Sequence, residues 1–230
     1  MTSSTVSSRS RKRPEERRAE ILAAAADIAL EEGLERITLR AVADRLGVRP
    51  GLITHYFPAA DELVLEAFER AAVGERGRFF PADGTPVERL AHFIDHVESG
   101  ASLALARLWL NARHLSRFSP ALDTLLQEQD ALDQTQLIAL IRDGITSGDF
   151  VDVDAEAASI RIFIAVDGGG SYVNTTAVID HPAHVHFARD VAEWTLGLDS
   201  GTLERAQEIA QLRGRQPRNG PGPGSRTSPA

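Results

Sequence analysis

The sequence predicts an all-α protein, in which a three-helix N-terminal unit is followed by a larger helical domain. Apolar residues recur every three or four positions through most of the chain, which is the period of an amphipathic helix. Proline and glycine stand between these stretches, where they begin and end helices. No stretch shows the sustained alternation of apolar and polar residues that predicts a half-buried strand.

The first helix is predicted from Pro14 to about Glu32. Its sequence is rich in Ala and Leu, and Ile21, Ala25 and Ile28 share one apolar stripe. This stripe is the surface on which the following short helices can pack.

Residues 37–57 predict two short helices joined by a tight turn. Thr38 is placed to cap the first, because its hydroxyl can accept a hydrogen bond from a free backbone N–H group. Gly47 follows Leu46 where a left-handed residue ends a helix, a conformation that glycine takes at little cost. Pro50 suits the first turn of the second helix, where a missing N–H group costs nothing. This is the helix-turn-helix design, whose second helix enters the major groove of DNA.

The second of these helices, at about 50–56, is too short to be stable alone and must pack on the preceding helix. Leu52 and Ile53 turn inward and leave the opposite face for an outside partner. The residues expected to contact double-stranded DNA are Thr38, Arg40, Arg49, Pro50, Gly51, Thr54, His55 and Tyr56.

Residues 14–75 together resemble the DNA-binding domain of the tetracycline-repressor-like (TetR) family of bacterial transcriptional regulators. The match runs in register from the first helix to a fourth helix that begins near Asp61. It rests on Ile21, Ala24, Gly33, Thr38, Ala41 to Ala43, Gly47, Val48, Gly51, Tyr56, Phe57 and Leu63. The resemblance implies a DNA-binding head.

Two positions depart from the family's pattern. Thr54 stands where such sequences usually carry Tyr, and Ala60 stands where they usually carry Lys. In the family both positions tend to hold phosphates, so the departures imply weaker sequence-independent binding. Thr38, Tyr56 and the helix N-termini are then left to hold the DNA backbone.

The N-terminal arm is basic, since residues 7–18 carry six Lys or Arg residues against two acids. We assign residues 1–13 as a disordered basic arm. Two interpretations stay open: a solvated leader, or an arm that follows phosphates or enters the minor groove.

The net charge of −8 divides unevenly along the chain. Residues 1–60 hold 10 basic and 8 acidic residues, a charge of +2, whereas residues 61–230 hold 15 and 25, a charge of −10. An acidic body behind a mildly basic head orients a protein on DNA.

Several classes of protein are disfavoured by what the sequence lacks. Cys is absent, so disulfides and thiolate metal sites are excluded. The N-terminus has no apolar core like that of a secretory signal, and no apolar run is long enough to span a membrane, so we expect a cytoplasmic protein. No Ser-His-Asp spacing, phosphate loop or metalloprotease motif is present, and we therefore predict no enzyme and no cofactor.

Residues 76–198 are predicted to form a helical regulatory and dimerisation domain. Helices are expected from Pro86 to about Glu98, from Ala101 to Arg117, from Pro120 to Ser147, from Asp154 to Asn174, and from Pro182 to Leu196. Residues 199–230 end in a Pro-, Gly- and Ser-rich segment and are assigned as a disordered tail.

Polar and aromatic residues on otherwise apolar helices are candidates for a ligand pocket, which needs apolar walls and a few placed polar groups. Large aromatic residues equally suit a plain core. The candidates are His92, Phe93, His96, Trp109, Arg113, His114, Phe163 and Tyr172. His92 and His96 are spaced to chelate a metal, but neither they nor His181, His184 and His186 have an obvious carboxylate partner, so we predict no metal site.

A second set of motif residues lies in the body, namely Trp109, Leu110, Pro120 to Leu122, Gly144, Gly148 to Phe150, Asp154, Asp167 and Gly168. Through them the second domain resembles, more loosely, the regulatory domains of the choline-responsive, betaine-operon subgroup. The resemblance implies a ligand site and a homodimer formed by the last two helices of each subunit. Gly168, Gly169 and Gly170 cost about 1 kcal/mol each relative to Ala inside a helix. Close approach of a partner helix would offset this cost, and a helix break at Gly168 is the alternative.

These observations predict a homodimeric, ligand-responsive transcriptional regulator. We expect a repressor that binds a pseudo-palindromic operator and is released by a small-molecule inducer. The alternative is a small-molecule-binding or interaction protein whose head no longer recognises specific DNA.

Overall fold

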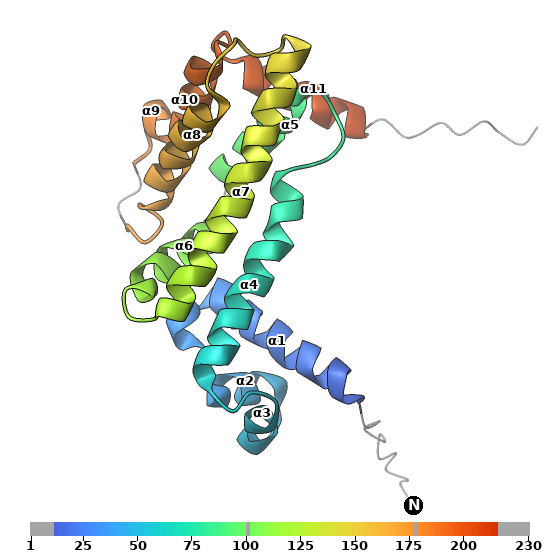
Figure 1. Cartoon of the computed structure of the whole chain (residues 1–230), viewed down its shortest axis with the longest axis vertical. Helices are drawn as coiled ribbons and strands as arrows, with labels where there is room; N and C mark the ends of the chain where they lie inside the picture. Colours follow the sequence, from blue (N-terminus) through green and yellow to red (C-terminus); the bar gives the residue numbers. More distant parts are fainter. Residues whose placement is uncertain (1–11, 100–101, 177–178, 216–230) are drawn as a thin grey trace, which may run out of the picture.

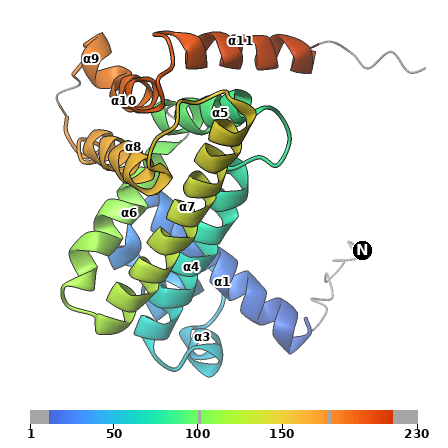
Figure 2. The ribbon, with the colours of Figure 1, turned by 45° about the horizontal axis from the view of Figure 1, so that its top comes forward.

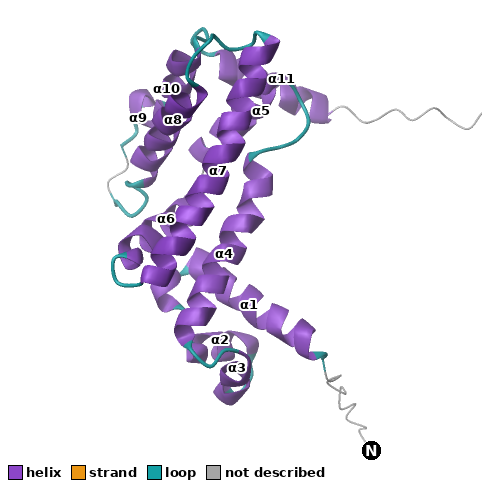
Figure 3. Cartoon of the chain, viewed as in Figure 1, coloured by secondary structure: helices purple, strands orange, loops and turns teal. Residues whose placement is uncertain are grey.

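The computed structural model describes residues 12–99, 102–176 and 179–215, and within these ranges every regular element is a helix (Figure 3). The all-α prediction is confirmed. The head consists of α1 (Pro14–Glu31), the short 3-10 helix η1 (Leu34–Arg36), α2 (Leu39–Leu46) and α3 (Pro50–Tyr56). The remaining helices are α4 (Ala60–Phe79), α5 (Pro86–Glu98), α6 (Leu103–Ser116), α7 (Pro120–Ser147), α8 (Ala155–Gly170), α9 (Pro182–Val185), α10 (Phe187–Leu196) and α11 (Thr202–Arg215).

Helix α4 joins the head to the body, which consists of α5–α11. It starts beside α2 and α3 at one end of the molecule and runs alongside α7 toward the body (Figure 1). The sequence analysis ends the head at residue 75, but α4 continues without a break to Phe79. A rigid helix therefore crosses the expected boundary.

The core of the head continues into the body. Phe57, Leu63 and Phe68 are fully buried there, and they share one cluster with Leu108 of α6 and Leu122 of α7. Burial of such a side chain contributes about 1.5–3 kcal/mol. The head is therefore held against α6 and α7 by apolar packing and does not hang from a linker.

A second core fills the rest of the body, between α5, the second half of α7, α8, α10 and α11. Gly144 of α7 is required there, because a Cβ atom at this position would lie 2.1 Å from the ring of Phe150. That ring, 4% exposed, seals the turn between α7 and α8. Phe79, at the end of α4, packs against both cores.

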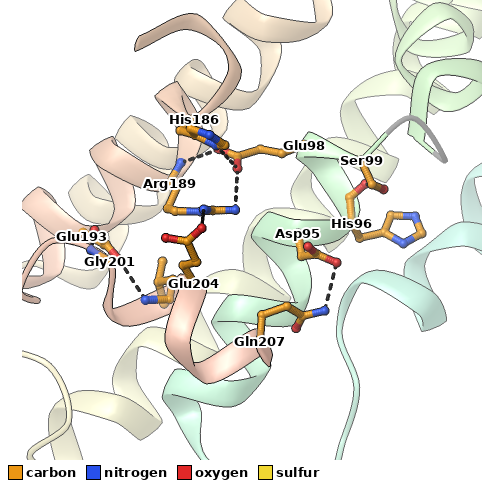
Figure 4. A network of polar contacts seen from close by, with 11 residues as sticks. Asp95, His96, Glu98, Ser99, His186, Arg189, Glu193, Gly201, Glu204 and Gln207 are labelled. Carbon is orange, nitrogen blue, oxygen red and sulfur yellow. Dashed lines mark hydrogen bonds and ion pairs between the residues drawn. The ribbon is translucent and has the colours of Figure 1, made fainter. Parts of the chain in front are cut away.

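Two helices differ from the sequence prediction. Helix α8 ends at Gly170 and not at Asn174, and the helix expected over residues 182–196 is divided at His186. The division follows from Glu98 of α5, whose carboxylate accepts a hydrogen bond from the backbone N–H of Arg189 at 3.0 Å (Figure 4). An anion is favoured at a helix N-terminus, so Glu98 fixes the start of α10.

The prediction of a disordered tail from residue 199 is wrong over α11. Glu193 of α10, only 2% exposed, accepts hydrogen bonds from the backbone N–H groups of Gly201 at 2.9 Å and Leu203 at 2.8 Å. Leu203 is buried, and Gln207 donates to Asp95 of α5 at 2.9 Å. These contacts hold α11 across the end of the body, where Figure 2 shows it beside α5 and α10. Residues 216–230 lie outside the described residues.

Substitution of Glu193 tests whether its carboxylate holds α11 in place. Glu193→Gln leaves one carbonyl acceptor for the part-buried N–H of Gly201 and the buried N–H of Leu203, so we expect it to lower the free energy of unfolding by about 1–3 kcal/mol. Urea unfolding measures the loss, and tryptic cleavage within 204–213 measures local release of α11. Glu208→Gln, an exposed change on the same helix, is the control. An unfolding curve of Glu193→Gln that overlays the control would contradict the capping role.

Candidate nucleic-acid interface and ligand cavity

The turn between α2 and α3 has the geometry that the sequence predicts. The hydroxyl of Thr38 accepts a hydrogen bond from the backbone N–H of Ala41 at 3.0 Å. Gly47 has φ +63° and ψ +38°, the left-handed conformation expected at the end of α2. The N–H of Val48 then donates to the carbonyl of Ala43 at 3.0 Å, which closes the turn.

Helix α3 is anchored through its inner face. Ile53 has no exposed surface, and neither does Phe57, which immediately follows the helix. Both belong to the core formed with α1 and α4. Arg18 of α1 extends over the ring of Phe57, 4.7 Å from its centroid, and pairs with Glu66 of α4 at 2.6 Å. The orientation of this short helix is therefore set by its neighbours.

The structure brings the predicted DNA-contacting residues to one outer surface of α2, the turn and α3. All of them are exposed except Tyr56, which is half-buried and packs edge-on against His55. Thr54 donates its hydroxyl hydrogen to the carbonyl of Pro50 at 3.3 Å. This leaves the oxygen lone pairs and the methyl group of Thr54 toward the outside. Arg40 lies 3.8 Å from Asp44 in an exposed pair.

Charge on this surface is carried chiefly by Arg49, the residue that precedes α3. No acidic side chain of the described residues pairs with it. The basic residues of the arm differ, since Lys12 and Arg17 both pair with Glu20, and Arg13 pairs with Glu16. Exposed pairs of this kind contribute little and can be exchanged for phosphate. Residues 1–11 of the arm lie outside the described residues.

A cavity of about 500 Å³ lies in the body, within the 300–1,000 Å³ range typical of small-molecule sites. The end of α4 and helices α5–α8 supply its walls. The lining residues are Phe79, Phe80, Phe93, Val97, Ser102, Leu105, Ala106, Trp109, Leu110, Arg113, Asp130, Asp133, Gln134, Ile160, Phe163, Ile164, Val166, Asp167, Gly170 and Ser171.

Aromatic rings form much of the cavity wall. The rings of Phe80 and Phe93 are stacked, with centroids 5.1 Å apart, and Phe163 meets Phe93 edge-on at 6.0 Å. Trp109 meets Phe68 of α4 edge-on at 5.3 Å. The negative faces of such rings attract cations.

Three carboxylates face the same space. Arg113 lies between two of them, 3.4 Å from Asp130 and 2.9 Å from Asp167, while Asp133 pairs with Arg76 of α4. Burial raises the pKa of all three carboxyl groups, although the arginines oppose the shift. The cavity thus has three carboxylates against two guanidinium groups. The surplus is one negative charge. Asp133 and Arg76 are mostly shielded from water, at 17% and 16% exposure, whereas the side chains of Asp130 and Asp167 remain 46% and 52% exposed.

Half of the predicted pocket residues line this cavity, namely Phe93, Trp109, Arg113 and Phe163. The other four do not. His92 forms a hydrogen bond with the carbonyl of Arg78 at 2.7 Å, and the ring of His96 lies edge-on against Phe79. His114 is exposed beside Phe118, and Tyr172 lies beside His184 in a separate surface hollow.

Sequence analysis missed the acidic side of the cavity. Asp130 and Asp133 are three residues apart on α7 and share one face, and Asp167 interrupts the apolar α8. The acid within an apolar helix is a signal that could have been used. In the described part of the chain no group of three His, Cys, Asp or Glu side chains could hold a metal ion. None of the described helices is long and apolar enough to cross a membrane.

Comparison with known proteins identifies the head. Residues 21–67 match the family model of bacterial regulatory proteins of the tetR family. No curated protein sequence matches the chain significantly.

Three solved structures that are similar to most of this chain are described as transcriptional regulators. A regulator from Saccharomonospora viridis in complex with choline aligns with a TM-score of 0.66 and 22% identity, over 78% of this chain and 95% of that one. A regulator from Pseudomonas aeruginosa PAO1 has a TM-score of 0.63 and 24% identity over 85% and 96% of the two chains. A TetR regulator from Haloarcula marismortui has 0.64 and 23%, over 80% and 97%.

The family match defines the head, and the structural matches extend the likeness in fold over the body. The chain therefore carries the N-terminal domain of the bacterial regulatory proteins of the tetR family, on a body with the fold of TetR-family transcriptional regulators.

Proposed function

We propose that the protein is a transcriptional repressor that a small molecule releases from DNA. The observation that carries this proposal is the course of α4, which packs in the core of the head and ends at the wall of the cavity. We infer that the protein has two arrangements, which differ in the position of α4 and of the head. A ligand in the cavity can act on the head through α4, provided that it binds these two arrangements of the protein with different affinity.

The outer face of α3 would read bases in the major groove, while the helix N-termini and Tyr56 hold phosphates. Arg49 precedes the first turn of α3, from which a guanidinium can reach guanine or a phosphate. Two heads related by a twofold axis would then read the two halves of a pseudo-palindrome.

DNA binding is tested with duplexes from the region flanking the protein's own gene, compared with random duplexes of equal length. We expect preferential binding to one flanking site. Arg49→Ala should cost about 1–3 kcal/mol there and relax preference at one position of each half-site if Arg49 reads a base. A uniform loss on all DNA would place Arg49 on a phosphate, the pattern that we expect of Tyr56→Phe.

Arg142→Ala, which removes an exposed charge from the body, is the matched control. Equal affinity of the unchanged protein for flanking and random DNA would contradict the proposal. The chain would then be a ligand-binding or interaction protein whose head does not recognise specific DNA.

For the effector, we propose a molecule with an apolar portion and one positive charge. Aromatic walls favour the apolar portion, and the surplus carboxylate among Asp130, Asp133 and Asp167 favours the charge. An anionic effector would meet like charge there. The structurally similar regulator from S. viridis was solved with choline, a quaternary ammonium compound.

Charge preference is tested by calorimetry with choline and 3,3-dimethyl-1-butanol, in which a carbon replaces the ammonium nitrogen. We expect choline to bind at least about tenfold more tightly, a difference of 1.4 kcal/mol or more. Asp167→Asn should weaken choline binding and leave the neutral compound unaffected. Equal affinity for the two compounds would show that the cavity does not select a cation.

For assembly, we propose a homodimer through α8 and α10, the counterparts of the two helices that the sequence analysis assigned to the interface. Their outer faces carry apolar side chains, among them Ile164 at 66% exposure and Trp194 at 70%. Exposed apolar patches mark protein interfaces. Gly168 and Gly169 stay helical, which excludes the alternative of a helix break at Gly168, and a Cβ atom at either would meet nothing of the same chain within 4 Å.

That open space makes Gly169→Leu an informative variant, because the added side chain fits the single subunit. We expect the variant to fold normally, as measured by circular dichroism, and to sediment largely as a monomer where the unchanged protein is a dimer. Gly74→Leu, at an equally open and exposed position of α4, is the control. An intact Gly169→Leu dimer would exclude this face as the interface.

A further inference from the structure

Arg76 forms an ion pair between α4 and the body. The guanidinium of Arg76 pairs through Nε with the carboxylate of Asp133 on α7. Its Nη2 donates to Gln129 of the same helix, to the side-chain oxygen at 2.8 Å and to the backbone carbonyl at 3.3 Å. Arg76 and Asp133 are only 16% and 17% exposed, and Gln129 is buried. This cluster is partly shielded from water, where a charge pair is stronger than at the surface.

Asp133 also lines the cavity, together with Asp130 and Asp167. Those two pair with Arg113 of α6, so neither is bonded to α4. Of the three cavity carboxylates, Asp133 alone connects the contents of the cavity to the helix of the head, within the described residues.

We propose that the Arg76–Asp133 pair is a latch through which a cation in the cavity controls the position of α4 and hence of the head. The inference rests on the proposed function and names its coupling residues. A second cation beside one carboxylate shares its negative charge and repels the first cation. A ligand cation beside Asp133 therefore weakens the bond to Arg76, and the guanidinium, too costly to leave shielded without its anion, draws α4 away from α7.

The geometry of α4 explains how a small release is transmitted. Phe68 lies on the same helix in the core of the head and meets Trp109, another cavity wall residue. Between Arg76 and the head the helix is continuous, so movement at its body end changes the tilt of the end that carries α2 and α3. Close-packed cores switch between discrete arrangements and do not deform smoothly.

The first experiment needs neither operator nor effector. Arg76→Met and Arg70→Met remove the same charge from the same helix, but Arg70 is exposed and no described residue pairs with it. We expect Arg76→Met to speed amide hydrogen exchange in the second half of α4 and in α2 and α3, whereas Arg70→Met does not. If the Arg76–Asp133 pair fixed only its own part of α4, hydrogen exchange would change only at that end of the helix. Unchanged exchange in α2 and α3 of Arg76→Met would overturn the proposal.

The second experiment measures coupling with choline as the probe. The quantity is the ratio of DNA affinities without and with saturating choline, which we expect to be about fivefold or more in the unchanged protein. Asp133→Asn and Asp130→Asn each remove one cavity charge, so both should weaken choline binding. Only Asp133→Asn should bring the ratio close to one. Asp133→Glu, which keeps the carboxylate, should give a ratio like that of the unchanged protein.

The outcomes distinguish a failure of the proposed function from a failure of the latch. Absence of DNA or choline binding by the unchanged protein would refute the proposed function, while the exchange experiment would still decide whether the latch holds the head. Equal loss of the ratio in Asp130→Asn and Asp133→Asn would refute the latch alone. If Asp133→Asn fails to fold, Arg76→Met provides the same comparison, because it removes the other partner of the pair, and it too should bring the ratio close to one.

Discussion

The fold depends on the inability of the seven-residue helix α3 to stand alone. A helix of this length is not stable in water, so its orientation has to come from its contacts. Ile53 and Phe57 supply them by full burial against α1 and α4, and the same core extends to Leu108 and Leu122 of the body. Helix α3 thus packs at the edge of a core that also includes residues of α6 and α7. A displacement of α4 within this core would therefore disturb the contacts that orient α3.

The cavity obeys a second constraint, which is the cost of holding charge away from water. Aromatic walls reduce solvation, and burial accordingly raises the pKa of Asp130, Asp133 and Asp167. Each acid is offset by an arginine from another helix: Arg113 links α6 to both α7 and α8, and Arg76 links α4 to α7. Since two guanidinium groups serve three carboxylates, a cationic occupant completes the charge balance that the chain leaves incomplete.

Local sequence features predicted the head well because each acts over a few residues. Thr38, Gly47 and Pro50 set helix ends through their own backbone preferences, and those ends lie where the sequence placed them. The misses concern long-range contacts. Order in α11 depends on Glu193 accepting from Gly201 and Leu203, and the break at His186 depends on Glu98, which is far away in the sequence. The acidic side of the cavity likewise arises only when α7 and α8 meet.

The polar cluster at the far end of the body complements the one beside α4. Glu98 contacts Arg189 at 3.0 Å and His186 at 3.4 Å, and Arg189 also reaches Glu204 of α11 (Figure 4). This cluster ties α5, α10 and α11 into one unit, and none of its members lines the cavity. The far side of the body is therefore fixed by ion pairs that lie outside the cavity wall. Of the polar ties described, the Arg76 cluster is the one that both faces the cavity and holds the helix of the head, so the proposed effect of a ligand would reach the head through this cluster.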